Sequence, residues 1–341
     1  RDIFDADIEY QRIPGLEIVN TNIPRHYELE PLEQISYQIK FTFNAKTDED
    51  PKITFIIPTF NNVVFLTNVI YHLIEKNKSR SQFEIIIADD GSTDNSSNVI
   101  EDIFQIYRKE INLIYLYWHK ENKIRGEQQF FRAGLIRNLA ARHSKGMFLL
   151  FLDSDMLVFD NFAQVCLDEL KSSDVIQFQR FHIHQHISLK NPNYNSIRKN
   201  IDTYVEENHY WSKFFQANEW RSLPCYWKYT CTYALGLSKD NFIKLGMFKK
   251  YYISYGFEDT DLGYEAHKAG LKFKLIQMPL YHLTHYGKQQ YKNSAQKRFH
   301  LLSKTAELFY LQHLDREIYL LLRNYFNYQN ISVKTRSILD R

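Results

Sequence analysis

Short apolar runs alternate with helix-length segments from Pro51 onward, and this alternation limits the folds open to the chain more than any other feature. Four apolar runs of strand length, at 53–57, 83–88, 111–117 and 147–152, are separated by segments of helical period at 62–77, 94–109 and 132–144. Such repetition predicts an α/β fold with a mostly parallel sheet and helices on both faces. Ligands of these sheets bind beyond the carboxyl ends of the strands.

Polar clusters follow three of the four expected strands, at the position where each strand ends. They are Pro58-Thr59-Phe60-Asn61, Asp89-Asp90-Gly91-Ser92 and Asp153-Ser154-Asp155. Because the carboxyl ends of parallel strands share one edge of a sheet, we expect these clusters to form a single site.

The Asp153-Ser154-Asp155 cluster places two carboxylates one residue apart at the end of a strongly apolar run. Carboxylate oxygens are the ligands that Mg²⁺ and similar hard cations prefer, and such ions keep positions open for substrate phosphates. The cluster therefore indicates a divalent cation with a diphosphate. Taken alone, the same three residues could instead cap the next helix.

Asp90 and Arg137 are candidates for nucleotide recognition. A carboxylate at a strand end can accept the imide N–H of a uracil ring, and Gly91 permits close approach of the backbone. Ordinary turn chemistry is the alternative for this segment. Arg137 lies on an expected helix with small neighbours, from which it could face a base or a phosphate. An isolated arginine there would be read as solvated surface.

A third acidic cluster opens a later helix at Glu258 and Asp259. A carboxylate there can deprotonate an incoming nucleophile while its neighbour binds the acceptor, although both are also favourable at a helix N-terminus for electrostatic reasons. His282 and His285 follow about twenty residues later, and either imidazole could complete a metal shell with Asp155.

These elements in this order resemble the family-two glycosyltransferases of the GT-A fold, over about residues 52 to 285. The Gly256-Phe257-Glu258-Asp259 segment is also similar to galactosyltransferase-like and chondroitin-polymerase-like enzymes. The resemblance implies a GT-A (Rossmann-like) sheet with helices on both faces. It further implies roles for individual residues: Pro58, Thr59, Asn61, Asp89, Asp90, Arg137, Asp153 and Ser154 at the nucleotide sugar, Asp153, Asp155 and His282 at the metal, Asp259 as base, and Glu258 at the acceptor.

The activity implied by the resemblance is transfer of a hexosyl or N-acetylhexosaminyl group from a nucleotide-diphosphate donor, a UDP-sugar, with Mn²⁺ or Mg²⁺. The acceptor would be a glycan, a protein or a small molecule. The chain lacks the Gln-x-x-Arg-Trp motif and the membrane helices of processive synthases, so we expect non-processive transfer, with inversion. A catalytically silent sugar-nucleotide-binding or scaffolding protein is the alternative. A nucleotidyltransferase would be expected to have a glycine-rich loop, which residues 58–62 lack.

Aromatic residues are dense between 211 and 257, and Trp227 and Phe257 are the candidates for an acceptor platform because sugar rings pack on aromatic faces. Packing in the core is the alternative. His182, His184 and His186 alternate along an expected strand, and ligands so arranged seldom converge on one ion. We therefore expect these histidines to face solvent or an acceptor.

The domain organisation follows from the same pattern. We expect an N-terminal arm or small subdomain at 1–50, a catalytic domain at 51–285 and a C-terminal helical extension at 286–341. The catalytic domain divides into a nucleotide-sugar half, 51–160, and an acceptor half, 161–285. Apolar residues at helical spacing predict one helix from about Ser294 to Leu322.

Composition narrows the class of protein. A net charge of +3 is too small to drive nonspecific nucleic-acid binding, and no run of 18 apolar residues is present. Three cysteines without paired spacing fit a reducing compartment, so we expect a cytoplasmic protein, at the inner face of the membrane if it meets one. Peripheral membrane contact and homo-oligomerisation are left open. Because the sequence begins at Arg1, we expect it to be part of a longer chain.

Overall fold

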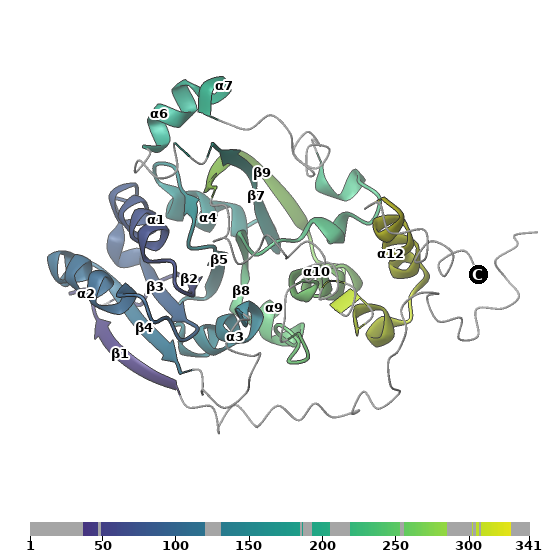
Figure 1. Cartoon of the computed structure of the whole chain (residues 1–341), viewed down its shortest axis with the longest axis horizontal. Helices are drawn as coiled ribbons and strands as arrows, with labels where there is room; N and C mark the ends of the chain where they lie inside the picture. Colours follow the sequence, from purple (N-terminus) through teal and green to yellow (C-terminus); the bar gives the residue numbers. More distant parts are fainter. Residues whose placement is uncertain are drawn as a thin grey trace, which may run out of the picture.

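A nine-stranded sheet forms the centre of the molecule (Figure 1), with the strand order β1-β4-β3-β2-β5-β8-β7-β9-β6. This computed structural model describes residues 37–46, 49–119, 131–184, 186, 193–204, 219–252, 256–284, 302, 305–306 and 308–328. Among these residues no helix combines the length and the apolarity needed to cross a membrane.

Six of the nine strands run in the same direction. These are β2 (Ile53–Thr59), β3 (Phe83–Asp89), β4 (Asn112–Trp118), β5 (Phe148–Leu152), β7 (Val175–Ile183) and β9 (Phe273–Leu283). The other three are antiparallel to their neighbours: β1 (Tyr37–Phe43), β6 (Met156–Leu157) and β8 (Ala234–Ser238). The predicted α/β fold with a mostly parallel sheet is confirmed. Every residue of β2 and β3 is buried, as expected for strands covered on both faces.

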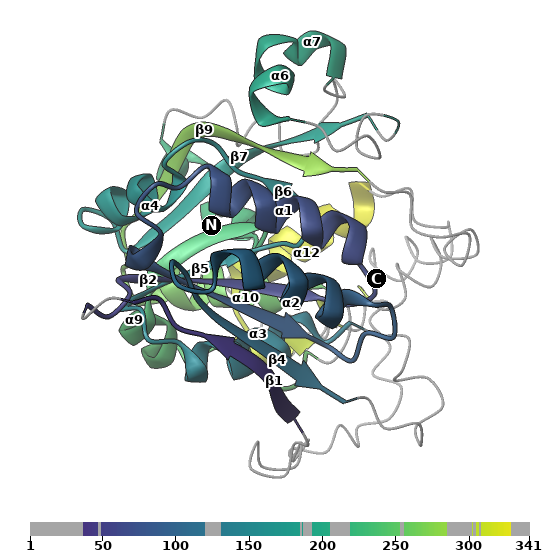
Figure 2. The same cartoon turned by 90° about the vertical axis from the view of Figure 1, so that its left-hand side faces the viewer.

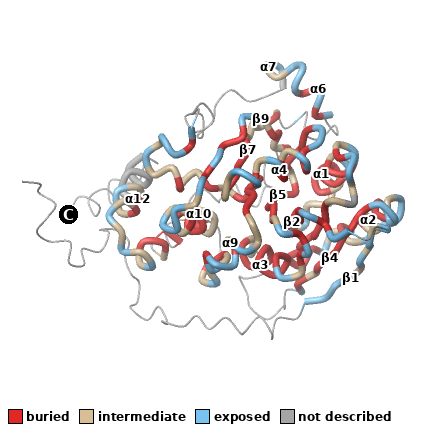
Figure 3. Tube along the Cα trace, turned by 180° about the vertical axis from the view of Figure 1, so that it is seen from behind, coloured by how far each residue is buried: buried red, intermediate tan, exposed pale blue. Residues whose placement is uncertain are grey.

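Helices cover both faces of this sheet (Figure 2). Side chains alternate along β2, so that Phe55 packs in one apolar cluster and Ile56 in another. The first cluster includes residues of α1 (Val63–Glu75), α2 (Ser96–Tyr107) and α4 (Phe162–Leu170). The second includes residues of α3 (Ala133–His143), α9 (Lys239–Lys244) and α10 (Glu258–Lys268). Figure 3 shows this burial along the central strands, whereas β1 is exposed at the sheet edge.

Shorter elements complete the described fold. They are the 3₁₀ helices η2 (Arg80–Gln82), η4 (Trp220–Ser222) and η5 (Tyr226–Tyr229) and the helices α6 (Tyr194–Lys199) and α7 (Ile201–Tyr204). Strand β1, within the predicted N-terminal arm, joins the sheet by pairing with β4.

The described C-terminal segment packs on η5 and α10. A third apolar cluster joins Phe309 and α12 (Arg316–Tyr328) to Trp227 and Tyr264. The prediction of one continuous helix is wrong, because Leu314 adopts a left-handed conformation with φ 47°. Asp315 then starts α12, since its Oδ1 accepts a hydrogen bond of 2.7 Å from the backbone N–H of Glu317.

The packing of α10 on η5 depends on Gly263. A Cβ added there would lie 2.6 Å from the carbonyl oxygen of Trp227 and 2.6 Å from Cβ of Thr230. We expect Gly263→Ala to lower the free energy of unfolding by about 1–3 kcal/mol, although alanine is the better helix former. Urea denaturation measures this change. Gly134→Ala, in α3, is the matched control because its Cβ would approach Phe248 no closer than 3.1 Å. Equal stability of the two variants would contradict the prediction.

Candidate active site

The polar clusters that follow β2, β3 and β5 lie together at one edge of the sheet. Thr59 pairs with Asp89 across β2 and β3, and Ile56 pairs with Phe151 across β2 and β5. The strand ends are therefore almost level. The backbone N–H of Asp90 donates to the carbonyl oxygen of Thr59 at 3.0 Å, which closes the first two turns together. The structure thus places the polar clusters together at the carboxyl ends of these strands, as expected from the sequence.

Asn61 braces the turn that follows β3. It adopts a left-handed conformation with φ 51°. Its backbone N–H donates to Ser92 Oγ at 2.8 Å, and its side-chain oxygen accepts from the backbone N–H of Thr93 at 2.8 Å. The amide oxygen of Asn61 thus shapes the wall of the site by binding the neighbouring turn.

Asp89 and Asp90 have different roles in the structure. Asp89 is buried, and its two oxygens accept from the backbone N–H of Ser92 at 2.7 Å and from the Tyr115 hydroxyl at 2.6 Å. Burial raises the pKa of this carboxyl. Both oxygens of Asp89 thus bind the turn and Tyr115, and its contact with a nucleotide stays a prediction.

Arg132 is a residue of this site that sequence reasoning missed. Its Nε and Nη2 donate to Asp90 Oδ1 at 2.9 and 2.6 Å, and its backbone N–H donates to Oδ2 at 2.9 Å. The guanidinium lies 3.8 Å from the ring centroid of Trp118. Asp90 therefore sits beside a stacked cation. The only signal in the sequence was a basic residue just before the helix that carries Arg137.

Arg137 connects the strand-end carboxylates to α10. Its Nη2 donates to Asp153 Oδ1 at 2.6 Å, and the residue is 2% exposed. Its charge lowers the pKa values of Glu258 and Asp259, against the effect of their burial. Nε and Nη1 of Arg137 are buried and have no hydrogen-bond partner among the described residues. Arg137 is thus a buried cation with unused donors between two acidic groups.

Asp155 and His282 come together as predicted from the sequence. Asp155 Oδ2 lies 3.4 Å from His282 Nε2, and the Asp155 carbonyl oxygen accepts from the backbone N–H of Leu283 at 2.8 Å. The neighbouring Ser154 Oγ accepts from Asn62 Nδ2 at 3.0 Å, which ties this turn to the end of β2. His285 lies outside the described residues. The choice of His282 over His285 as the metal ligand therefore stays a prediction.

His182 also belongs to this group, although the alternating histidines were expected to face solvent or an acceptor. Parallel pairing of β7 and β9 places it opposite His282, and the two Nδ1 atoms are 2.8 Å apart. One of the two must donate this hydrogen bond. If His282 Nδ1 carries the proton, its Nε2 keeps a lone pair toward Asp155. Only the pairing of two distant strands reveals this contact.

Asp155 and His282 are close enough to bind one divalent cation, whereas the ligand atoms of Asp153 do not come within 4.8 Å of both. Two ligands of one octahedral ion at about 2.1 Å lie about 3 Å apart, close to the separation of the Asp155 and His282 atoms. Two carboxylates with one imidazole suit Mn²⁺ or Mg²⁺. Burial and the nearby Asp155 raise the pKa of Asp153, and Arg137 opposes that shift.

Glu258 and Asp259 begin α10 on the other side of Arg137. The preceding Phe257 is left-handed, with φ 67°, and turns the chain into the helix. Burial, together with the Asp259 carboxylate, raises the pKa of Glu258 to about 7, and burial also raises that of Asp259. Asp259 Oδ1 accepts from the backbone N–H of Thr260 at 2.8 Å. Adjacent carboxyls of this kind share protons and titrate as a pair.

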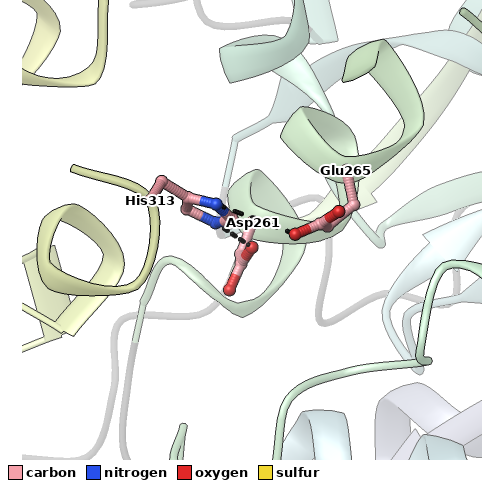
Figure 4. A group of neighbouring side chains, drawn as sticks. All are labelled: Asp261, Glu265 and His313. Atoms are coloured by element: carbon pink, nitrogen blue, oxygen red, sulfur yellow. Dashed lines mark hydrogen bonds and ion pairs between the residues drawn. The ribbon is translucent and has the colours of Figure 1, made fainter. Parts of the chain in front are cut away.

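A second group of acidic and histidine side chains includes Asp261 and Glu265, further along α10 (Figure 4). His313 Nε2 is 2.8 Å from Asp261 Oδ1 and its Nδ1 is 3.7 Å from Glu265 Oε1. The Lys268 ammonium lies 3.2 Å from the same Glu265 oxygen and 3.3 Å from His313 Nδ1. The ammonium of Lys268 thus provides the positive charge that a metal ion would otherwise bring to these side chains. We therefore infer that their contacts link the C-terminal segment to α10.

Trp227 and Phe257 lie in the core. Trp227 is fully buried with its ring centroid 4.9 Å from that of Tyr264, and Phe257 stacks on Phe309 at 5.6 Å. A ring buried this way offers no face to a sugar. This burial favours the alternative, core packing, over an acceptor platform at these two residues.

Comparison with known proteins agrees with this geometry. Residues 54–246 match Glycosyl transferase family 2. An uncharacterised glycosyltransferase of Bacillus subtilis, YfnE, is 25% identical over 260 residues, which cover 66% of this chain and 62% of that protein. The chondroitin synthase of Pasteurella multocida is 24% identical over 311 residues, 82% of this chain and 30% of the synthase. The matches thus span less than two thirds of these relatives.

Solved structures show the same fold. A crystal structure of residues 1–349 of Staphylococcus aureus TarS with UDP-GlcNAc superposes with a TM-score of 0.57 at 16% sequence identity, covering 84% of this chain and 77% of that one. This likeness confirms the predicted GT-A fold. The family match spans more than half of the chain and includes the strand-end clusters, Arg137, Asp153 and Asp155. This chain belongs to glycosyl transferase family 2.

Proposed function

We propose that this chain transfers a sugar from a UDP-sugar to an acceptor hydroxyl, with inversion at the anomeric carbon and with Mn²⁺ or Mg²⁺ as cofactor. One observation carries the proposal. Arg137 forms an ion pair with Asp153, one of the predicted metal ligands, and its charge also lowers the pKa values of Glu258 and Asp259. A donor site and an acid/base pair are therefore adjacent.

The donor end of the site is formed by the strand ends. Asp90, with Arg132 stacked on Trp118, provides polar partners for a base, and Pro58 and Thr59 line the adjoining strand end. TarS, which has the same fold, was solved with UDP-GlcNAc, which supports a UDP-sugar as donor. Asp153, Asp155 and His282 would hold the divalent cation, which neutralises charge on the departing diphosphate.

The acceptor end is formed by the start of α10. Asp259 accepts the proton of the acceptor hydroxyl while the hydroxyl oxygen forms a bond to the anomeric carbon. The bond from that carbon to the phosphate oxygen breaks, and UDP leaves with its electron pair. Glu258 binds the acceptor by hydrogen bonding. A glycan, protein or small-molecule acceptor and a cytoplasmic location are part of this proposal. The presence of Asp155 and Asp259 disfavours a catalytically silent protein.

Removing the metal ligand Asp155 should weaken nucleotide binding. We expect Asp155→Ala to lose roughly tenfold or more of the Mn²⁺-dependent affinity for UDP, because the ion would bridge protein and diphosphate. Isothermal titration calorimetry with and without chelator measures this. Asp168→Ala, an exposed change of the same charge on α4, serves as control. If chelation leaves UDP affinity unaltered in the wild type, the metal bridge is refuted.

Replacing the proposed base should separate turnover from binding. Asp259→Asn keeps the shape of the side chain and removes its charge, so kcat should fall by about 10²- to 10⁴-fold while UDP affinity stays the same. Initial rates with a labelled UDP-sugar and calorimetry give both quantities, with Asp168→Asn as the control. Near-normal turnover would remove Asp259 from the mechanism, and lost UDP binding would point to a metal-site role.

The raised pKa of Glu258 gives a pH-dependent stability. Folding shifts this pKa from 4.5 to about 7, so the folded state binds the proton more tightly than the unfolded chain does. Stability should therefore fall as pH rises from 4.5 to 7. Glutamine does not ionise, so Glu258→Gln should raise the Tm relative to wild type at pH 8 and show no such gain at pH 4. Thermal unfolding tests this, with the exposed Glu219→Gln as control. A gain of equal size at both pH values would contradict the assignment.

A further inference from the structure

Arg180 on β7 is a partly buried arginine beside the metal-type ligands, and neither the sequence motifs nor the proposed mechanism uses it. We infer that Arg180 binds a phosphate oxygen of the donor diphosphate and stabilises the charge that develops as UDP leaves. This assignment rests on the proposed function and adds a residue to it.

The position of Arg180 is fixed by Tyr233. Its guanidinium carbon lies 4.4 Å from the ring centroid of this tyrosine. The Tyr233 hydroxyl donates to the carbonyl oxygen of Phe178 at 2.5 Å, and the Tyr233 carbonyl oxygen accepts from the backbone N–H of Asp153 at 3.1 Å. The ring that carries the cation is therefore bound to the turn that carries the acidic metal ligands.

Arg180 also lies on the face of β7 that points toward Asp155 and His282. Residues two apart on a strand share a face, so Arg180 and His182 point the same way. His182 contacts His282, whose other ring nitrogen faces Asp155. A diphosphate bound by the metal would thus meet Arg180 from the strand side.

The charge of Arg180 lacks a protein counter-ion. No carboxylate oxygen of the described residues lies within 4.0 Å of its guanidinium nitrogens, and its Nε is buried without a hydrogen-bond partner. Arg137, by contrast, forms an ion pair with Asp153 at 2.6 Å. Because Nε is buried without a partner and Arg180 forms no ion pair with the described residues, an anion that reaches it gains charge-assisted hydrogen bonds.

A phosphate fits the guanidinium of Arg180 in shape and charge. The planar guanidinium fork matches two oxygens of a phosphate, and hydrogen bonds between ionised groups are the strong ones. Negative charge on the diphosphate increases as the bond to the sugar breaks. A cation fixed on a tyrosine ring needs little reorganisation to stabilise that charge, so Arg180 should contribute to kcat as well as to binding.

Calorimetry with two probes tests the assignment on the full chain in Mn²⁺. UDP carries the diphosphate and uridine does not, so Arg180→Met should weaken UDP binding by about 10- to 100-fold and leave uridine binding unchanged. Arg180→Gln, which keeps a polar side chain, should show the same split, and Arg180→Lys should recover part of the affinity for UDP. Arg221→Met is the matched control, because it removes the same charge from an exposed arginine packed near Tyr226.

The outcomes separate this assignment from the proposed function. If the wild type binds UDP and the Met and Gln variants bind it equally well, Arg180 is not a phosphate ligand. An equal loss for UDP and uridine would show a structural role, and an effect confined to the acceptor KM would place the anion on the acceptor; both overturn the assignment. If the wild type itself fails to bind UDP, the proposed function fails and the assignment falls with it.

Discussion

The buried guanidinium of Arg137 is the interaction on which the rest of the site depends. A cation that is 2% exposed needs negative partners, and the structure supplies them from the turn after β5 and from the start of α10. Helix α3 carries Arg137 to the carboxyl ends of the strands and packs against Phe248. Asn138 fixes the same contact, since its side chain bonds both the N–H and the carbonyl oxygen of Phe248, at 3.0 and 2.7 Å.

Polar residues at the sheet edge divide into those that build the turns and those that face the site. Asn61 and Asp89 direct their oxygens to backbone N–H groups, which explains how a turn of this shape is stable. Asp90 instead accepts a hydrogen bond from the guanidinium of Arg132. The C-terminal segment supports α10 in a comparable way, because His313 contacts Asp261, two residues beyond Asp259. Some residues that the sequence marks as possible ligands, such as Asn61 and Asp89, thus bind other protein groups and hold the turns of the site in place.

Much of the fold could be predicted from the chain alone. Apolar periodicity gave the four parallel strands and the helices between them with boundaries close to those observed, because local burial patterns are written in the sequence. The break at Leu314 could not be predicted, since Leu302, Ala306, Tyr310 and Ile318 keep a helical spacing across it. Core packing against Trp227 and the cap at Asp315 decide it instead.

The site divides along the same line. The sequence by itself determined which carboxylates stand at strand and helix ends, namely Asp90, Asp153, Asp155 and Asp259, because a strand end and a helix start are local features. Only the tertiary structure decided that Asp89 binds Tyr115, that Trp227 is buried in the core, and that His182, Arg132 and Arg180 adjoin the acidic groups. These contacts join strands and helices that are far apart in the chain. The spacing of residues along the sequence therefore does not determine which distant side chains come into contact across a sheet.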